Sequence, residues 1–203
     1  SALVAQPIAS PTSTTAYTVT VTGSNGCTAT DVVIVNVNTT PPTVDAGVDK
    51  NLNCTTTSTT IGSAALAGNA YSWSPETGLS SSSVAQPTAN PTVTTTYTVT
   101  VTGSNGCTAS DVVVVNVNTT PPVADGGPNK NLNCTTPSTT IGVAAVSGNT
   151  YNWSPAAGLS ATNVAQPTAS PSSTTTYTVV VTGSNGCTAS DVVLVNVNNT
   201  PPT

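Results

Sequence analysis

The sequence has very little charge and few aromatic residues. Among 203 residues, Lys and Arg together number 2, Asp and Glu together number 7, aromatic residues make up 3%, and His, Met and Phe are absent. Two basic residues are too few for the positively charged surface by which proteins bind nucleic acid. Without histidine, a G-x-S-x-G elbow, a cluster of metal ligands or a glycine-rich phosphate loop, the sequence predicts neither an enzyme nor a bound cofactor.

Long apolar runs and helical periodicity are also missing. The valine stretches, such as residues 112–115, fall far short of the ~20 apolar residues that span a bilayer, so we expect no membrane insertion. No signal peptide is visible at Ser1, and we expect an internal or mature segment. Thr, Val, Ser, Ala and Asn dominate instead. Because these residues favour strands and turns, the composition predicts an all-β protein.

The chain is built from one repeated unit. One cysteine of the unit recurs at spacings of 107 − 27 = 80 and 187 − 107 = 80, and the other at 134 − 54 = 80. Residues 43–122 and 123–202 are identical at 58 of 80 aligned positions. About 80 residues suffice for a small domain with its own core. We therefore predict the C-terminal half of a repeat in residues 1–42 and full repeats in residues 43–122 and 123–203.

Alternation of apolar and polar residues predicts a β-sandwich in each full repeat. In "TTTYTVTVTGSNGCTAS" (residues 94–110), Tyr97 and the two valines after it fall on one face of a strand, and threonines fall on the other. The "GSNG" that follows predicts a tight hairpin turn. About seven short strands in each repeat suggest a β-sandwich. The aromatic residues expected to anchor its core are Trp73, Trp153, Tyr97 and Tyr177.

The cysteines indicate disulfides. Each full repeat has two cysteines, and none of the five in the chain forms the C-x-x-C spacing of a zinc or thioredoxin-like site. We expect one disulfide per repeat, Cys54–Cys107 and Cys134–Cys187, with Cys27 bridged to a cysteine upstream of the chain. Such bridges favour an oxidising, extracellular setting. The alternative is a cytosolic protein with buried free thiols.

Longer motifs resemble a known group of repeats. The string "YSWSPETGLSSSSVAQPTANPTVTTTYTVTVTGSNGCTASDVVVV" (residues 71–115), with "DAGVDKNLNC" before it, resembles the PKD-like and immunoglobulin-like tandem repeats of large bacterial cell-surface proteins. Among these are adhesins and gliding-motility-associated proteins exported by the type IX secretion pathway. The resemblance covers the whole chain. It implies β-sandwiches with a disulfide from the first strand region to the final hairpin, serving as spacer or adhesive modules on the bacterial surface.

Carboxylates near the joints between repeats are candidate calcium ligands. Asp45 and Asp49 follow the "PP" of one joint, and Asp125 follows the next. Hard oxygen ligands of this kind could bind calcium and stiffen the array, although the second of these positions is Asn129 in the last repeat and no EF-hand loop is present. The alternative is that they are solvated turn aspartates.

Three functions are compatible with these features. The first is a structural stalk of an extracellular bacterial surface adhesin or fibre, in which neighbouring repeats are the partners and the proline-rich joints at residues 38–42 and 118–122 make a semi-rigid rod. The second is a subunit of a self-assembling filament, in which another chain completes the half-repeat. A weaker third is a module that binds carbohydrate or matrix, such as host or surface glycans, through exposed aromatic residues.

Overall fold

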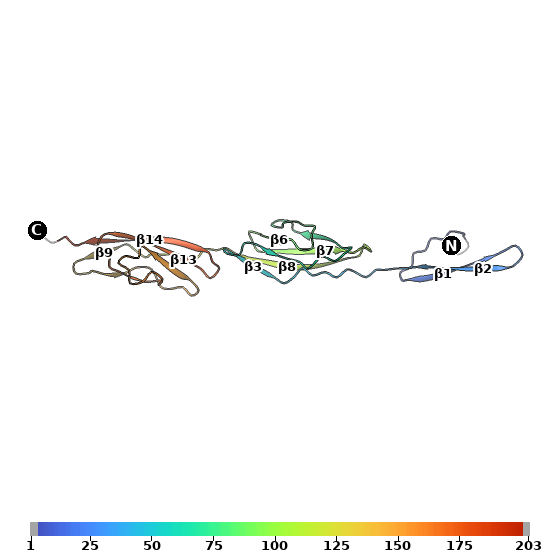
Figure 1. Cartoon of the computed structure of the whole chain (residues 1–203), viewed down its shortest axis with the longest axis horizontal. Coiled ribbons are helices and arrows are strands. Elements are labelled where there is room, and N and C mark those ends of the chain that lie inside the picture. Colours follow the sequence, from blue (N-terminus) through green and yellow to red (C-terminus); the bar gives the residue numbers. More distant parts are fainter. Residues whose placement is uncertain (1–3, 201–203) are drawn as a thin grey trace.

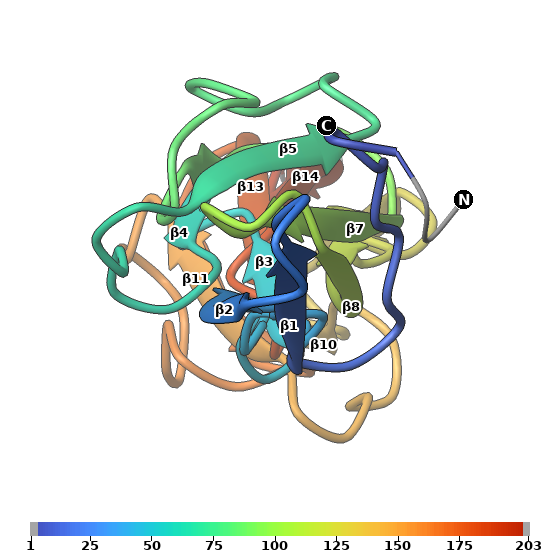
Figure 2. The ribbon, with the colours of Figure 1, turned by 90° about the vertical axis from the view of Figure 1, so that its right-hand side faces the viewer.

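The structure, a computed structural model, describes residues 4–200. These residues form three elongated segments in a row, called here the N-terminal hairpin (residues 4–42), the middle repeat (43–122) and the last repeat (123–200). The outer edges of the first and last predicted units, residues 1–3 and 201–203, lie outside the described residues. The segments follow one another in a line (Figure 1), and in an end-on view they lie one behind another (Figure 2).

Every regular element of the described residues is a β-strand, which confirms the predicted all-β class. The N-terminal hairpin consists of β1 (Thr15–Thr22) and β2 (Thr28–Val35). The strands of the middle repeat are β3 (Lys50–Asn53), β4 (Thr59–Thr60), β5 (Ala70–Ser74), β6 (Thr88–Ala89), β7 (Thr95–Thr102) and β8 (Thr108–Asn118). The strands of the last repeat are β9 (Lys130–Asn133), β10 (Thr139–Thr140), β11 (Thr150–Ser154), β12 (Thr168–Ala169), β13 (Thr175–Thr182) and β14 (Thr188–Asn198).

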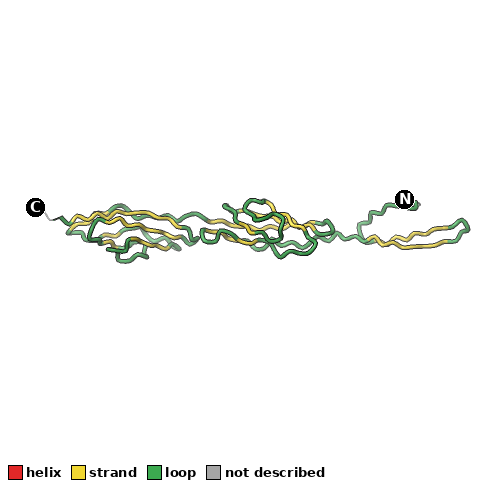
Figure 3. The backbone as a smooth tube through the Cα atoms, turned by 45° about the horizontal axis from the view of Figure 1, so that its top comes forward, coloured by secondary structure: helices red, strands yellow, loops and turns green. Residues whose placement is uncertain are grey.

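Each full repeat has two sheets. In the middle repeat the larger sheet has the order β3-β8-β7-β5, and β4 pairs with β6 in the smaller one. β7 and β8 form the long antiparallel hairpin predicted from the "GSNG" turn, whereas β3 lies parallel to the far end of β8. The last repeat copies this arrangement as β9-β14-β13-β11 and β10-β12. The long strands run along the axis of the rod (Figure 3).

The core of each repeat lies between its two sheets. Alternate residues of β7 and β8 point inward because successive side chains of a strand face opposite sides. Trp73 is 2% exposed and Tyr97 is 0% exposed, and Trp153 and Tyr177 of the last repeat are buried to the same degree. The other members of the buried hydrophobic cluster of the middle repeat are Ala46, Leu52, Ile61, Ala89, Val99, Val101, Val113 and Val115.

One expected strand is much shorter than its sequence pattern suggests. Residues 58–66 read as a strand, but only Thr59–Thr60 pairs, as β4. The chain turns at Gly62, whose φ of +83° belongs to the region that favours glycine. A Cβ on Gly62 would collide with the carbonyl of Ala85 and lie 2.9 Å from the Trp73 ring. The tight approach of the tryptophan therefore ends the strand.

The N-terminal hairpin exposes the face that the full repeats bury. Tyr17 is 38% exposed and Val19 is 56% exposed, whereas the equivalent Tyr97 and Val99 are at most 1% exposed. β1 and β2 pair in the same register as β7 and β8, but no second sheet covers them in the described residues.

Candidate functional site: the joint between repeats

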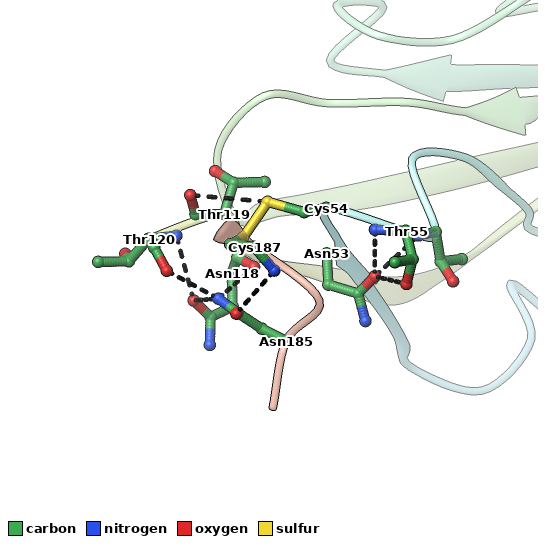
Figure 4. The surroundings of a disulfide bond; sticks show 9 residues. Asn53, Cys54, Thr55, Asn118, Thr119, Thr120, Asn185 and Cys187 are labelled. Atoms are coloured by element: carbon green, nitrogen blue, oxygen red, sulfur yellow. Dashed lines mark hydrogen bonds between the residues drawn. A yellow bond between two sulfur atoms is a disulfide. The ribbon is translucent and has the colours of Figure 1, made fainter. Parts of the chain in front are cut away.

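The joint between the middle and last repeats is closed by a disulfide. Cys54 and Cys187 are bonded across the joint with a Cα–Cα distance of 5.0 Å, and 133 positions separate them in the sequence. Figure 4 shows the bridge beside Asn118 and Asn185. Cys187 is only 2% exposed, so the joint buries it almost completely.

The predicted pairing of the cysteines within each repeat is wrong. Cys54 follows β3, which pairs with the end of β8 at Asn118, whereas Cys107 precedes the start of β8 at Thr108. The 11 residues of β8 rise by about 3.3 Å each, so these two cysteines lie some ~35 Å apart at opposite ends of the repeat. A disulfide requires Cα atoms within about 7 Å. The predicted Cys134–Cys187 bond fails for the same reason, because the last repeat has the same strand order.

The cysteines that meet instead come from facing ends of adjacent repeats. β3 delivers Cys54 to the C-terminal end of the middle repeat. The turn from Gly183 to Gly186, which joins β13 to β14, delivers Cys187 to the N-terminal end of the last repeat. In the described residues, Cys27, Cys107 and Cys134 are free; Cys27 and Cys134 are exposed and Cys107 is half-buried.

Asn185 ties the same turn to the joint. Its side-chain Nδ2 donates to the backbone carbonyl of Thr120 at 2.9 Å and to the carbonyl of Asn118 at 3.3 Å. It also donates to the side-chain oxygen of Asn118 at 3.1 Å. The backbone N–H of Cys54 donates to the carbonyl of Asn185 at 3.3 Å. The turn therefore contacts both the linker and the end of β3, next to the disulfide.

The turn around Cys54 has its own support. The side-chain oxygen of Asn53 accepts hydrogen bonds from the backbone N–H of Thr55 at 2.9 Å and of Thr56 at 2.8 Å, an Asx-turn that reverses the chain after β3. Thr55 packs closely on Gly186 of the facing turn. A Cβ on Gly186 would lie 2.5 Å from the methyl group of Thr55, so any larger residue at this position would have to displace the Thr55 side chain.

The first joint of the chain repeats the polar contacts of the second. Nδ2 of Asn105 donates to the carbonyl of Thr40 at 2.9 Å and to the carbonyl of Asn38 at 3.3 Å. Cys107 occupies the position of Cys187 in this turn, and a Cβ on Gly106 would meet no atom within 4 Å. The hydrogen bonds from the turn asparagine to the linker are thus present at both joints, whereas the disulfide is present only at the second of these two joints.

The linker and the first strand of each repeat lie against the last strand over its whole length. In the middle repeat, the N–H of Ala46 donates to Asp111 at 2.8 Å, and Asp49 accepts from the N–H of Val114 at 2.9 Å. These bonds from Ala46 and from the N–H of Val112 hold the pKa of the Asp111 carboxyl below its ordinary value. In the last repeat the N–H groups of Gly126 and Val192 do the same for Asp191.

The calcium candidates serve backbone hydrogen bonds in this structure. Asp45 accepts from the N–H of Gly47 at 2.8 Å, and Asp125 accepts from the N–H of Gly127 at 2.7 Å. Asp49 binds the N–H of Val114, as described above. Among residues 4–200, no three His, Cys, Asp or Glu side chains come together in a way that could hold a metal ion.

The aromatic candidates have structural contacts. The indole N–H of Trp73 donates to the carbonyl of Val84 at 2.9 Å, and that of Trp153 donates to Val164 at 2.9 Å. The hydroxyl of Tyr97 donates to the carbonyl of Thr77 at 2.8 Å, and burial raises its pKa. Because the tryptophan rings are buried, they offer no open face on which a sugar could stack.

Sequence reasoning identified the cysteines but missed the role of the turn asparagines. The "GSNG" motif predicts a hairpin turn and the "NTTPP" motif a stiff linker, but neither pattern by itself predicts that the two are in contact. Both motifs recur with the same 80-residue period as the cysteines. This shared period is the sequence signal that could have indicated a contact between the motifs at each joint. The period itself does not identify the bridge, since the cysteine positions recur every 80 residues whether the bonds form within a repeat or between adjacent repeats.

Comparisons with other proteins describe similarities of fold. No protein-family model matches the chain, and none of the curated proteins matches it. The structure is similar to extracellular domains 3–5 of Drosophila OTK, with 13% identity, a TM-score of 0.41, and coverage of 92% of this chain and 72% of that one. A three-immunoglobulin segment of titin gives 14% identity and a TM-score of 0.45, with 78% and 66% covered. A segment of mouse Cadherin-23 gives 16% identity and a TM-score of 0.44, with 91% and 74% covered.

Within residues 4–200, no helix has the length and apolar character needed to span a bilayer.

Proposed function

We propose that this chain is a stalk segment of a repetitive extracellular bacterial surface adhesin or fibre. The observation that carries the proposal is the Cys54–Cys187 bridge, which fixes one repeat end to end on the next. A bridge between domains adds little to a binding pocket, but it preserves the direction of a rod. The resemblance to bacterial surface repeats supports the proposed location, and the disulfide agrees with an oxidising compartment.

The joints support a rod of defined length. Asn105 and Asn185 make their 2.9 Å contacts to linker residues 65 positions earlier, at Thr40 and Thr120. From residue 105 to residue 120 the chain follows β8 and then the linker, so one repeat advances the rod by 15 residues. At about 3.3 Å per residue this is roughly 50 Å for each repeat. Each added repeat therefore lengthens the rod by the same amount. The repeats carry little charge and few aromatic residues that could bind a ligand.

The stalk function is tested by measuring how the length of the rod changes with the number of repeats. Small-angle X-ray scattering on the chain and on a variant without residues 43–122 should give rods of the same cross-section whose lengths differ by about 50 Å. The same pair, anchored at one end on beads and labelled at the other, should show the same difference in label height. A compact or freely bent chain, or equal heights for the two lengths, would overturn the proposal. Binding of the isolated chain to a glycan array would favour the carbohydrate-binding alternative.

A self-assembling filament is the second candidate, and the open face of the N-terminal hairpin supports it. The exposed valines of this face are Val19 at 56%, Val21 at 61% and Val33 at 60%, whereas their equivalents in the middle repeat are at most 1% exposed. Such a face favours a second sheet from another chain. Light scattering as a function of concentration tests this. Growth of long oligomers that stops when Val19→Thr and Val21→Thr are introduced would favour the filament, whereas a concentration-independent monomer excludes it.

A further inference from the structure

We propose that tension on the chain follows an extended covalent line through the Cys54–Cys187 bridge and bypasses the folded cores of both repeats. The line runs along β2, the linker and β3 to Cys54, crosses the bridge to Cys187, and continues along β14. This inference rests on the stalk function and deepens it, because it says how such a stalk would carry load without lengthening.

The first part of this line has no slack. From Thr40 to Asn53 the chain runs alongside the β7–β8 turn and then β8. Each contacting residue of this segment meets the residue 65 positions later in the sequence. Asn105 donates to Thr40, Ala46 donates to Asp111, and Asp49 accepts from Val114, each across 65 positions. Lys50 and Asn53 then pair with Val115 and Asn118. A segment that keeps pace with an extended strand is itself extended, so tension has almost nothing to straighten.

The bridge leaves the cores outside the load path. Residues 55–186 lie between the two bridged cysteines and include β5, β7 and β8 of the middle repeat and β9 to β13 of the last one. While the disulfide is intact, the ends of this segment stay joined at a Cα–Cα distance of 5.0 Å. Unfolding of either core then adds no length between the ends of the chain. Without the bridge, the same unfolding would release the whole segment.

The free cysteines continue the same line in neighbouring repeats. Cys134 ends β9 as Cys54 ends β3, and it is exposed beside a surface hollow lined by Leu132, Pro137 and Val197. Cys107 stands where Cys187 stands, in a turn whose asparagine already holds the linker. We infer that Cys134 bonds the Cys187 equivalent of a repeat that follows, and Cys107 the Cys54 equivalent of a repeat that precedes.

This pattern gives every repeat two load lines side by side. β3 would end one line at Cys54 while β8 carries the other from Cys107, and the two strands are hydrogen-bonded in parallel. The lines exchange places at each joint, since the line that leaves β3 enters β14 of the next repeat.

Bridge formation needs an oxidant. Two cysteine thiols lose two protons and two electrons as the S–S bond forms, and a small-molecule disulfide or a thiol–disulfide oxidoreductase accepts them and is reduced to two thiols. Oxidised glutathione serves as that disulfide in the experiments below.

Single-molecule force extension of the full chain, held at its two ends, tests the bypass. At forces that would unfold repeats without the bridge, the oxidised chain should gain no length from residues 55–186. Addition of a reductant under load should then open the bridge and, as the two cores unfold, release the 133-residue separation, a total gain of roughly 450 Å at about 3.4 Å per residue. Cys54→Ser should release this length without reductant, whereas Cys27→Ser should behave as the wild type.

The alternative pairing has a different signature. Bridges within repeats would enclose 107 − 54 = 53 and 187 − 134 = 53 residues, so reduction would give two gains of roughly 180 Å each. That result, or a gain near 450 Å on unfolding of the oxidised wild type, overturns the inference. Because the reductant acts on wild-type chain, a folding defect of the Cys54→Ser variant leaves the test intact. Neither result changes the scattering length that tests the stalk.

The continuation to Cys134 is tested by extending the chain. A further copy of residues 124–202, appended directly after Thr203 so that the 80-residue period is kept, and oxidised with glutathione, should form a disulfide between Cys134 and the appended equivalent of Cys187, identified by mass spectrometry of non-reduced peptides. The matched control carries Cys134→Ser and should leave that appended cysteine free while keeping Cys54–Cys187. A free Cys134 in the extended chain, or its bonding to Cys187, would overturn the continuation.

Discussion

The side chain of Asn185 donates to the backbone carbonyl of Thr120 at 2.9 Å, and the side chain of Asn105 donates to the carbonyl of Thr40 at the same distance. The joint at Thr120 also contains a disulfide, and the joint at Thr40 does not. The amide contact is therefore a property of the linker and turn themselves. It positions the facing ends of two repeats so that the cysteine of one reaches that of the other.

Replacement of Asn185 by alanine should loosen the second joint. Each lost hydrogen bond contributes about 0.5–1.5 kcal/mol, and the variant loses the donors to both Asn118 and Thr120. Formation of the Cys54–Cys187 bond in a glutathione buffer should become several-fold slower, because the thiols meet less often. Asn105→Ala serves as the control, since it changes the other joint and should leave this rate unchanged. Equal slowing by both variants would indicate a general folding defect.

Gly186 and Gly106 form a second matched pair. Both have positive φ, +74° and +78°, so alanine costs about 1–2 kcal/mol of backbone strain at either position. Only at Gly186 would the added Cβ strike a neighbour, Thr55, across the joint. Gly186→Ala should therefore reduce the equilibrium fraction of the Cys54–Cys187 bond about tenfold relative to Gly106→Ala in a redox buffer, measured by thiol labelling. Equal bond fractions would mean that Thr55 moves aside freely.

Most of the fold could be predicted from the sequence because its signals are local. The alternation around Tyr97 and the glycine-rich turn specify the β7–β8 hairpin, and a single tryptophan per repeat marks the core. The strand after Ser58 is shorter than its pattern predicts because its end depends on the approach of Gly62, which follows β4, to Trp73 of β5 in the other sheet.

The site was harder to predict than the fold. The pairing of cysteines depends on which end of the repeat each occupies, and this depends on β3 lying parallel to β8 rather than antiparallel to it. Local sequence does not distinguish these directions, since a four-residue strand such as Lys50–Asn53 reads the same in either. Parallel pairing places Cys54 at the far end from Cys107 and next to the following repeat. The partner of Cys54 thus follows from topology, which residue spacing alone does not determine.

The buried tyrosines should stabilise each repeat through a single hydrogen bond. The hydroxyl of Tyr177 donates to the carbonyl of Ala157 at 2.7 Å, as that of Tyr97 does to Thr77. Tyr177→Phe keeps the ring packing and removes the donor, so the free energy of unfolding should fall by about 1 kcal/mol. Chemical denaturation of the variant measures this loss. Tyr17→Phe is the control, because Tyr17 is 38% exposed and its loss should have little effect.

Acid should weaken the attachment of the linker to β8 and β14. The pKa values of Asp111 and Asp191 are lowered in the folded protein by the hydrogen bonds they accept, first from Ala46 and Gly126. A carboxyl whose folded pKa lies below its unfolded value contributes stability above the unfolded pKa, near about 4, and loses it as the pH falls through the folded pKa. The melting temperature of the wild type should therefore drop below about pH 4.

Asparagine at both positions isolates this effect. Asp111→Asn with Asp191→Asn keeps an oxygen that can accept from Ala46 and Gly126 but removes the titration. The double variant should be less stable than the wild type at pH 7, because a charged acceptor binds an N–H more strongly than a neutral one. As the pH falls below about 4, the wild type should lose this advantage and the two melting curves should converge. A stability difference that stays constant from pH 7 to pH 2 would show that these carboxylates do not titrate with folding, and that the linker is held to the last strand by the remaining backbone contacts.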